Sequence, residues 1–534
     1  MPKNWVSLVV SIGLAAIVPD VRAGELPELF IAIEPDPEPS PPDGRYRETF
    51  TVALNMEALK EPAHRIMLNL PGREQEVVEL QHWQPRRGYI QILDPEDPSG
   101  QNTITIPDPS ARPEDFWWRW YGKSAHYTVA LTTVDGIVAG RISSGLHRYA
   151  VEPFKAPSIQ LGLINSDFWQ THPSDGEGGE RARADTAHPT QAGPAAAALS
   201  TRDRGWPGDW DPSCPGSPPD GQYVIDVLLF YTQGILDRYF GNTSSVHAGL
   251  QSALDDANQA LRNGGIQNVT FSPRGPELLP NPGIDFIYDE APIVQALHRL
   301  AGVATAPPPV FYTFPGNVYV AARRDAMWAD IVALARDDLS GQQTCGYSVV
   351  NRWVANNDYP REPGPDFEKF AYLVFDPGCG ADRLNLAHEL GHQLGMEHDP
   401  ANYWAPGSLP SCPWSFAHKR SAGDPRFRFR TVTAYWQNIG HRPGPGDCGS
   451  DSNCPLIDSF STPLLEWAGD PASGGPPPFG LQPVGTVSGA WPIGIASASH
   501  PNRPAHGVDT LRRIAPFAQD YRARPELIFA NGFQ

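Results

Sequence analysis

The clearest hydrophobic pattern in the chain is an almost unbroken apolar run from Tyr223 to Tyr231. Such a run is typical of a strand that is covered on both faces, so we predict a buried strand here. Residues 246–261 repeat apolar positions with helical spacing, and Asn263-Gly264-Gly265 predicts where that helix ends. Two further apolar segments predict a second helix at residues 327–335 and a strand at residues 369–375.

The region before this one is dominated by β-prone runs, so residues 24–165 are predicted to form a β-rich domain. Residues 127–134 and 137–142 are two such runs, and Asp135-Gly136 between them is a strong hairpin signal. The aromatic residues at positions 116–120 are predicted to pack beneath such a sheet, with carbohydrate binding as the alternative.

Three segments are poor in periodic apolar residues. Residues 166–220 are rich in Pro, Gly, Ala, Ser and charged residues, so they cannot bury enough surface to offset chain entropy. We predict a flexible linker there, and proteolytic activation would be easiest within it. Residues 440–457 and 468–502 are rich in Gly and Pro, and they are predicted to be loops inside a second domain, residues 221–525.

The two ends of the chain differ in character. Residues 1–23 are predicted to be a secretory signal peptide, because Lys3 gives a positive start and mostly apolar residues follow as far as Val18. This apolar run is too short to favour the alternative, a membrane anchor. Residues 509–522 predict an amphipathic closing helix, and residues 526–534 form a tail. We therefore expect an exported protein without a membrane span.

The composition indicates which binding partners are disfavoured and which state of the cysteines is favoured. The net charge of −19 argues against nucleic acid or an anionic membrane surface as a partner. Six cysteines in an exported chain favour disulfides over redox catalysis, although the sequence does not choose among the pairings. Cys448 and Cys454 are close enough to close a small loop, and Cys345 with Cys379 is a second candidate pair.

The most informative stretch for chemistry is residues 388–399, which read HELGHQLGMEHD. On a helix, His388 and His392 lie one turn apart, so both imidazoles leave the same face and can bind one metal ion. Gly395 predicts the end of the helix, because glycine accepts the left-handed backbone that reverses the chain. This reversal can bring His398 back as a third nitrogen ligand.

The residues between the histidines extend this prediction. Leu386, Leu390 and Leu394 share the opposite face of the helix and are expected to be buried. Glu389 is offset from the histidine face by roughly 100°, so it can reach a metal-bound water without being a ligand. Three imidazoles and a water make the open, catalytic kind of Zn²⁺ site. Zinc would acidify the water, and Glu389 would act as the general base.

The motif resembles HExxHxxGxxH, the zinc-binding consensus of metzincin metallopeptidases. Asp399, directly after the third histidine, is similar to the reprolysin (adamalysin-like) branch of that family. Other segments resemble the secreted bacterial reprolysin-like proteases and follow in the same order. These segments are residues 223–232, 256–266, 345–347 and 460–463. The resemblance covers roughly residues 221–522.

The resemblance implies an α+β fold, in which a zincin-like catalytic domain with a mixed sheet and an active-site helix follows an inhibitory, propeptide-like domain. In metzincins the strand before the zinc helix is an exposed edge that pairs with an extended peptide substrate. Residues 370–375 would have that role, with an ordinary core strand as the alternative. For Cys214 we expect an ordinary disulfide, and the alternative that the resemblance offers is a cysteine switch that blocks the zinc.

The resemblance places two residues after the zinc motif close to the metal site. Thr433 stands where the resemblance places the methionine of the Met-turn, which packs beneath the three imidazoles. A smaller, partly polar side chain there would loosen that floor without removing a ligand. Tyr435 matches a tyrosine near the zinc of astacin-like and serralysin-like relatives. It would donate a hydrogen bond to the oxyanion, with a packing role in the core as the alternative.

The sequence therefore predicts a secreted, monomeric, zinc-dependent metalloendopeptidase that is made as a zymogen, inhibited by its own N-terminal part, and acts on protein or peptide substrates. The alternative is a zinc-holding binding or adhesion protein with impaired catalysis, suggested by Thr433 and the aromatic-rich N-terminal part. A zinc hydrolase of non-peptide amides is a third interpretation, which the extent of the resemblance disfavours.

Overall fold

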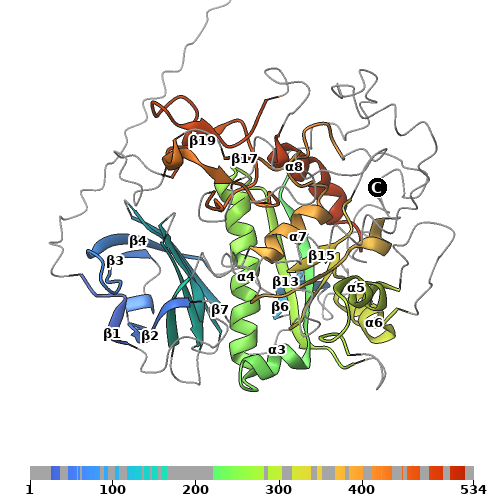
Figure 1. Ribbon diagram of the computed structural model, residues 1–534. Helices are drawn as coiled ribbons and strands as arrows, with labels where there is room; N and C mark the ends of the chain where they lie inside the picture. Colours follow the sequence, from blue (N-terminus) through green and yellow to red (C-terminus); the bar gives the residue numbers. More distant parts are fainter. Residues whose placement is uncertain are drawn as a thin grey trace, which may run out of the picture.

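The two largest sheets of the computed structural model lie on either side of a long helix, as Figure 1 shows. The structure describes residues 26–35, 46–56, 58–60, 63–83, 89–93, 103–107, 117–124, 126–134, 137–144, 147–153, 159–164, 221–281, 287–302, 316–337, 345–351, 367–378, 384–400, 411–421, 424–435, 448, 454–469, 480–496 and 505–522. The predicted signal peptide, linker and C-terminal tail lie outside these residues.

The N-terminal part is a nine-stranded antiparallel sheet that forms a half-barrel, in the order β1-β2-β11-β10-β9-β8-β7-β4-β3. Its strands are β1 (Phe30–Pro35), β2 (Tyr46–Leu54), β3 (Ala63–Leu68), β4 (Glu76–Trp83), β7 (Trp117–Lys123), β8 (Thr128–Val134), β9 (Ile137–Ser144), β10 (His147–Pro153) and β11 (Ile159–Ile164). A separate hairpin consists of β5 (Tyr89–Leu93) and β6 (Thr103–Pro107), and a 3-10 turn covers Ala58–Lys60.

The predicted hairpin in this part is confirmed. Strands β8 and β9 are antiparallel neighbours, and Val134 pairs with Ile137 across the predicted turn. The aromatic segment lies within the sheet instead of beneath it, as strand β7 between β4 and β8. The side chain of Trp120 is buried in the core of the half-barrel, so packing is the correct interpretation for this residue.

The C-terminal part is built on a five-stranded mixed sheet in the order β13-β12-β14-β16-β15. The strands are β12 (Tyr223–Tyr231), β13 (Val269–Leu278), β14 (Ile331–Ala335), β15 (Gly346–Ser348) and β16 (Tyr372–Phe375), and only β15 runs antiparallel to its neighbour. The helices are α3 (Gln233–Arg238), α4 (Thr243–Asn263), α5 (Ile293–Ala301), α6 (Val318–Met327), α7 (Asn385–Gln393) and α8 (Gly507–Ala518).

Helices cover both faces of this sheet. Val227 and Leu229 of β12 pack into one core with α4, α7 and α8, whereas Leu228 and Phe230 pack into another with α5 and α6. Burial on both faces explains the unbroken apolar run, and the prediction of this strand is confirmed with the same bounds. Helix α4 also confirms the prediction for residues 246–261, and it ends at Gly264.

The predicted helix at residues 327–335 is wrong. Helix α6 ends at Met327, Trp328 adopts a left-handed backbone conformation with φ +51°, and the following residues form strand β14. All five residues of β14 are buried between β12 and β16. A short apolar run fits a buried strand and a helix equally well by periodicity, which explains the error.

The edge-strand expectation for residues 370–375 is also wrong. Phe367–Phe370 is a 3-10 turn, and the strand that follows, β16, lies inside the sheet between β14 and β15. All four residues of β16 are buried, so the core-strand alternative is correct. Strand β15 is the edge of the sheet on this side.

Residues 468–502, predicted to be loop, include two short strands. β20 (Leu481–Pro483) and β21 (Trp491–Pro492) both pair with β19 (Leu465–Trp467). The remaining short elements are β17 (Lys419–Arg420), β18 (Phe429–Arg430) and a 3-10 turn at Pro425–Phe427. The closing helix is confirmed as α8, although it ends at Ala518 instead of Arg522.

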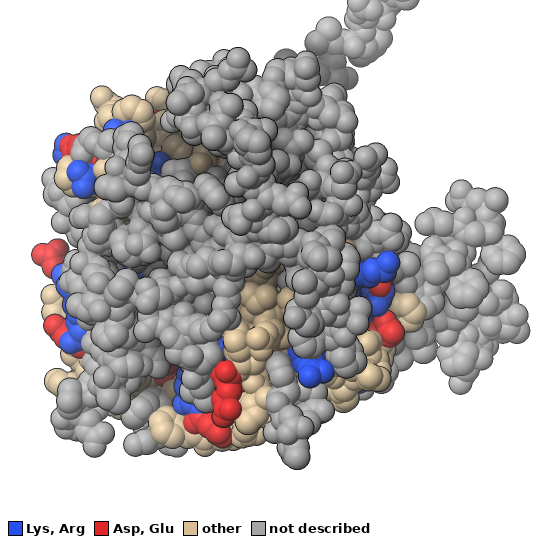
Figure 2. All heavy atoms as spheres, turned by 45° about the vertical axis from the view of Figure 1, so that its right-hand side comes forward, with Lys and Arg blue, Asp and Glu red and all other residues tan. Residues whose placement is uncertain are grey.

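Helix α4 stands between the two sheets, because β8 and β9 of the half-barrel pack against it (Figure 1). On the face shown in Figure 2, acidic and basic side chains of the described residues are interspersed. Within the described ranges, none of the helices is both long enough and apolar enough to cross a membrane.

Candidate metal centre

Helix α7 carries the first two histidines and is fixed through its opposite side. Leu386, Leu390 and Leu394 are at most 1% exposed and belong to the core beneath the sheet, as predicted. Their burial turns the other side of the helix, with His388 and His392, away from that core.

A buried glutamine ties the last turn of α7 to the sheet. The Nε2 of Gln393 donates hydrogen bonds to the carbonyls of Val349, at 3.1 Å, and Tyr372, at 3.2 Å. The backbone N–H of Asn351 donates to the carbonyl of His392 at 2.9 Å. This role was not predicted, because a glutamine between motif positions carries no pattern signal.

The helix ends as the sequence predicts. Gly395 has φ +84°, its N–H donates to the carbonyl of His392, and the N–H of Met396 donates to the carbonyl of Gly391, both at 2.9 Å. This pair of bonds is the Schellman arrangement that closes a helix with a left-handed residue. After the reversal, Glu397 forms backbone hydrogen bonds with Ser415 and with residue 417, which fixes the segment that carries the third histidine.

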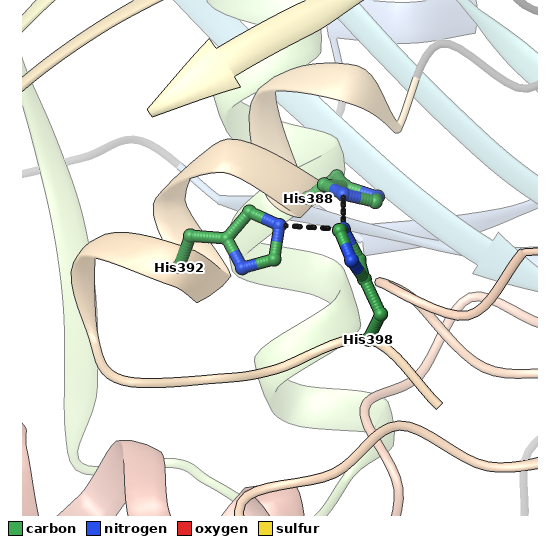
Figure 3. A group of neighbouring side chains, drawn as sticks. All are labelled: His388, His392 and His398. Atoms are coloured by element: carbon green, nitrogen blue, oxygen red, sulfur yellow. Dashed lines mark hydrogen bonds between the residues drawn. The ribbon is translucent and has the colours of Figure 1, made fainter. Parts of the chain in front are cut away.

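The three histidines converge on one point (Figure 3). The Nε2 atom of His398 lies 3.3 Å from Nε2 of His388 and 3.0 Å from Nε2 of His392. Bonds of about 2.0–2.1 Å from zinc to nitrogen at tetrahedral angles would place ligand nitrogens about 3.3 Å apart. The observed spacing therefore fits a single tetrahedral ion.

The protonation state of the imidazoles also fits a metal. The Nδ1 of His392 lies 2.7 Å from the carbonyl of Met396, so Nδ1 carries the proton and Nε2 presents its lone pair to the centre. Burial lowers the pKa of His388 well below its usual value, and His392 and Arg430 lower it further. His388 is therefore neutral, which is the form that binds metal ions.

Glu389 lies beside the histidines but is not part of the donor group. Its side chain is buried, and Oε2 accepts a hydrogen bond of 2.7 Å from the hydroxyl of Ser348 on β15. A Cβ atom on Gly346, two residues earlier on the same strand, would collide with Oε1 of Glu389. Neither residue of β15 was predicted to have a role, since only the fold brings the strand next to the motif.

Thr433 lies next to helix α7. Its Cγ2 is close to Gly391, where an added Cβ atom would meet it at 3.0 Å. Its hydroxyl donates to the carbonyl of Glu397 at 3.2 Å, next to the third histidine. The residue is buried and has φ +70°, which is rare for a β-branched residue.

Tyr435 is buried beside the histidines. Its ring centroid is 4.2 Å from that of His398 and 5.9 Å from that of His388. The backbone N–H of Tyr435 donates to Oδ2 of Asp399 at 3.3 Å, and its carbonyl accepts from Nζ of Lys419 at 3.1 Å. Asp399 and Lys419 are themselves 3.5 Å apart, so they connect the tyrosine to the end of the motif. No pattern in the sequence predicted a role for Lys419.

The disulfide predictions are partly tested. Cys448 and Cys454 form the predicted disulfide. Cys345 and Cys412 each belong to a disulfide as well, but not to one with each other among the described pairs. Cys379 and Cys214 lie outside the described residues, so the second predicted pair and the cysteine switch remain predictions.

Comparison with known proteins gives distant structural similarity only. No protein-family model and no curated protein sequence matches this chain. The chain is similar to one chain of a chaperone–substrate complex, with a TM-score of 0.32 and 14% identity over 57% of this chain and 36% of that chain. It is also similar to metalloproteinase-II from Bacteroides fragilis, with a TM-score of 0.31 and 14% identity over 63% of this chain and 82% of that one. The chain thus spans about a third of the first of these.

Proposed function

We propose that this chain is a zinc-dependent metalloendopeptidase of the metzincin type, related to the reprolysin-like branch. The observation that carries the proposal is the triangle of Nε2 atoms from His388, His392 and His398, with spacings of 3.0 and 3.3 Å. Three neutral nitrogens leave one tetrahedral position open, which distinguishes a catalytic from a structural zinc site.

The residues around this triangle have complementary roles in peptide hydrolysis. A zinc ion held by the three histidines would supply Lewis acidity to the substrate carbonyl and the attacking water. Glu389 takes the proton from water as its oxygen adds to the carbonyl carbon, and returns it to the nitrogen of the leaving amine. The net reaction consumes one water and leaves Glu389 ionised again. Tyr435, whose ring lies tilted against that of His398, is the candidate donor to the oxyanion.

The substrate class follows from the edge of the sheet. Strand β15 ends the sheet next to α7, and Ser348 of this strand contacts Glu389. An extended peptide added alongside β15 would be held through its backbone, with little dependence on sequence. We therefore propose protein or peptide substrates, and not nucleic acid. Secretion, synthesis as a zymogen, and a monomeric state belong to the same proposal.

Metal analysis together with a protease assay tests this function. The purified chain should contain about one zinc per molecule, and casein hydrolysis should stop with a chelator and return with zinc. Glu389→Gln should retain zinc and lose activity, whereas His392→Ala should lose the metal. Stoichiometric zinc without chelator-sensitive hydrolysis would instead support the alternative, a metal-holding binding protein.

A further inference from the structure

Helix α4 has two buried faces of opposite character. One face is apolar and belongs to the core beneath the C-terminal sheet; its residues are Val246, Leu250, Ala253, Leu254, Ala257, Ala260 and Leu261. The stripe through positions 248, 252, 255 and 259 lies on another side of the helix and is polar apart from Ala248. Strands β8 and β9 of the half-barrel pack against this helix. With its polar side facing water, α4 would be an ordinary amphipathic surface helix.

The half-barrel binds this polar stripe through charged groups. Arg119 on β7 forms an ion pair with Asp255, and the hydroxyl of Thr132 on β8 donates to Oδ2 of Asp255 at 2.7 Å. Arg119 is 5% exposed and Asp255 is 8% exposed. Both charges are thus withdrawn from water where the two parts of the chain meet.

A second arginine makes a wider set of contacts. Arg141 on β9 is 3% exposed and donates to Oδ1 of Asp256 at 3.3 Å. It also donates to both carboxylate oxygens of Asp458, at 2.7 and 3.1 Å. Arg148 on β10 adds a hydrogen bond to the carbonyl of Leu456 in the same segment. Two regions of the C-terminal part, α4 and residues 456–458, are therefore bound by arginines of one sheet.

Apart from these charged groups, the junction between the half-barrel and the C-terminal part contains few apolar contacts. The half-barrel and the C-terminal part have separate hydrophobic cores. The small cluster that joins them contains Val134, Ala139 and Ala248, with Ile137 packed against it. A cavity of about 130 Å³ lies between Tyr121 and Arg148 of the half-barrel and Asp458 and Trp467 of the C-terminal part, and this volume is large enough for several waters.

We propose that the half-barrel is a separable binding partner of the C-terminal part, held on α4 and on residues 456–458 by Arg119 and Arg141. Each side has its own core, and each exposes mainly polar groups once the two are apart, so both can exist in water without the other. The charged contacts give the association its position and most of its strength, because removing one partner leaves a buried carboxylate without its counter-ion. This inference does not depend on whether the metal centre is catalytic.

The proposal is tested by cutting the chain between the half-barrel and the C-terminal part. A recognition site for a specific protease is placed near residue 190 of the full-length protein, the chain is cut after purification, and the product is analysed by size-exclusion chromatography. The cut wild-type chain should elute as one complex that contains both fragments. In the Arg141→Gln variant the dissociation constant of the fragments should rise by about a hundred-fold or more.

The matched control is Arg426→Gln, which removes an arginine from an ion pair with Asp424 on the surface of the C-terminal part. This variant should dissociate like the wild type. Should Arg141→Gln fail to fold, Asp458→Asn removes one of the two carboxylates and should weaken association by about ten-fold. A wild-type complex that separates on cutting, or charge variants that bind as tightly as the control, would overturn the proposal. Zinc content and casein hydrolysis in the same samples report independently on the proposed function.

Discussion

The hydroxyl of Ser348 donates a hydrogen bond of 2.7 Å to the carboxylate of Glu389, across a sequence separation of 41 residues. The same hydroxyl lies 3.2 Å from the backbone carbonyl of Glu389. Both residues are buried, and Gly346 makes room for the carboxylate, because an added Cβ atom there would collide with it. The edge strand therefore fixes the orientation of the proposed general base, and Ser348 is a positioning residue.

Replacing Ser348 by alanine should lower kcat by roughly ten- to a hundred-fold, as expected for the loss of a hydrogen bond to a charged group. KM should change little, because the proposed contacts of β15 with a peptide substrate would come from its backbone. Steady-state kinetics on a peptide substrate separate the two parameters, and zinc analysis should give the wild-type content. Ser348→Thr, which retains the hydroxyl, should recover most of kcat. An effect confined to KM, or a loss of zinc, would contradict this role.

Gly395→Ala should destabilise the protein and weaken metal binding. The left-handed backbone at φ +84° costs a non-glycine residue about 1–2 kcal/mol. In addition, an added Cβ atom would lie 2.5 Å from Cδ1 of Ile514 and 3.0 Å from the carbonyl of Asn351. We expect a loss of more than about 2 kcal/mol in the free energy of unfolding, and a displaced His398.

The control for this substitution is Gly72→Ala. Gly72 also has a positive φ, of +65°, but an added Cβ atom there would meet nothing within 4 Å. It should therefore show only the backbone cost of about 1–2 kcal/mol and normal zinc affinity. Thermal unfolding and zinc titration of both variants decide the point; equal effects of the two would mean that crowding around Gly395 is unimportant.

The junction with the half-barrel should make stability depend on pH. Burial raises the pKa of Asp256 to about 7, with Asp458 and Asp255 adding to the shift and Arg141 opposing it. An unfolded aspartate titrates near 3.8, so the folded chain binds more protons between pH 4 and 7. The contribution of Asp256 to the free energy of unfolding is therefore greatest below pH 4. It decreases as pH rises to 7, by at most about 1.4 kcal/mol per pH unit.

Urea unfolding at several pH values checks this prediction against variants. In Asp256→Asn the titrating group is absent, so its stability should increase relative to the wild type as pH rises from about 4 to 7. Asp424→Asn is the control, because Arg426 holds the pKa of Asp424 at about 2 and its titration is complete below this window. Parallel curves for the wild type and Asp256→Asn would show that Asp256 does not titrate in the junction.

The sequence predicted those features that depend on local pattern. The helix end at Gly395, the buried leucines of α7 and the position of strand β12 follow from backbone preference and periodicity. The sequence also predicted the convergence of the three histidines, because the motif itself encodes the reversal between His392 and His398.

Features that depend on contacts between distant segments were missed or wrong. Strand β14 was predicted as helix, since only its neighbours β12 and β16 distinguish a short apolar run in a sheet from one in a helix. Residues 370–375 were predicted to be the edge strand, because no pattern in the sequence indicates that β15 pairs with the outer side of β16. Ser348 and Lys419 have no local signal and reach the site only through tertiary folding.

Thr433 offers a test in which glycine should be better than alanine. The residue adopts φ +70°, which is unfavourable for any side chain with a Cβ atom. Both Thr433→Ala and Thr433→Gly remove the hydrogen bond to Glu397 and the methyl contact with Gly391. Only glycine also removes the backbone strain. We therefore expect Thr433→Gly to be more stable than Thr433→Ala by about 1 kcal/mol, the reverse of the usual order. Chemical denaturation of the two variants with zinc bound measures this difference, and a more stable alanine variant would mean that residue 433 is not held in the left-handed conformation.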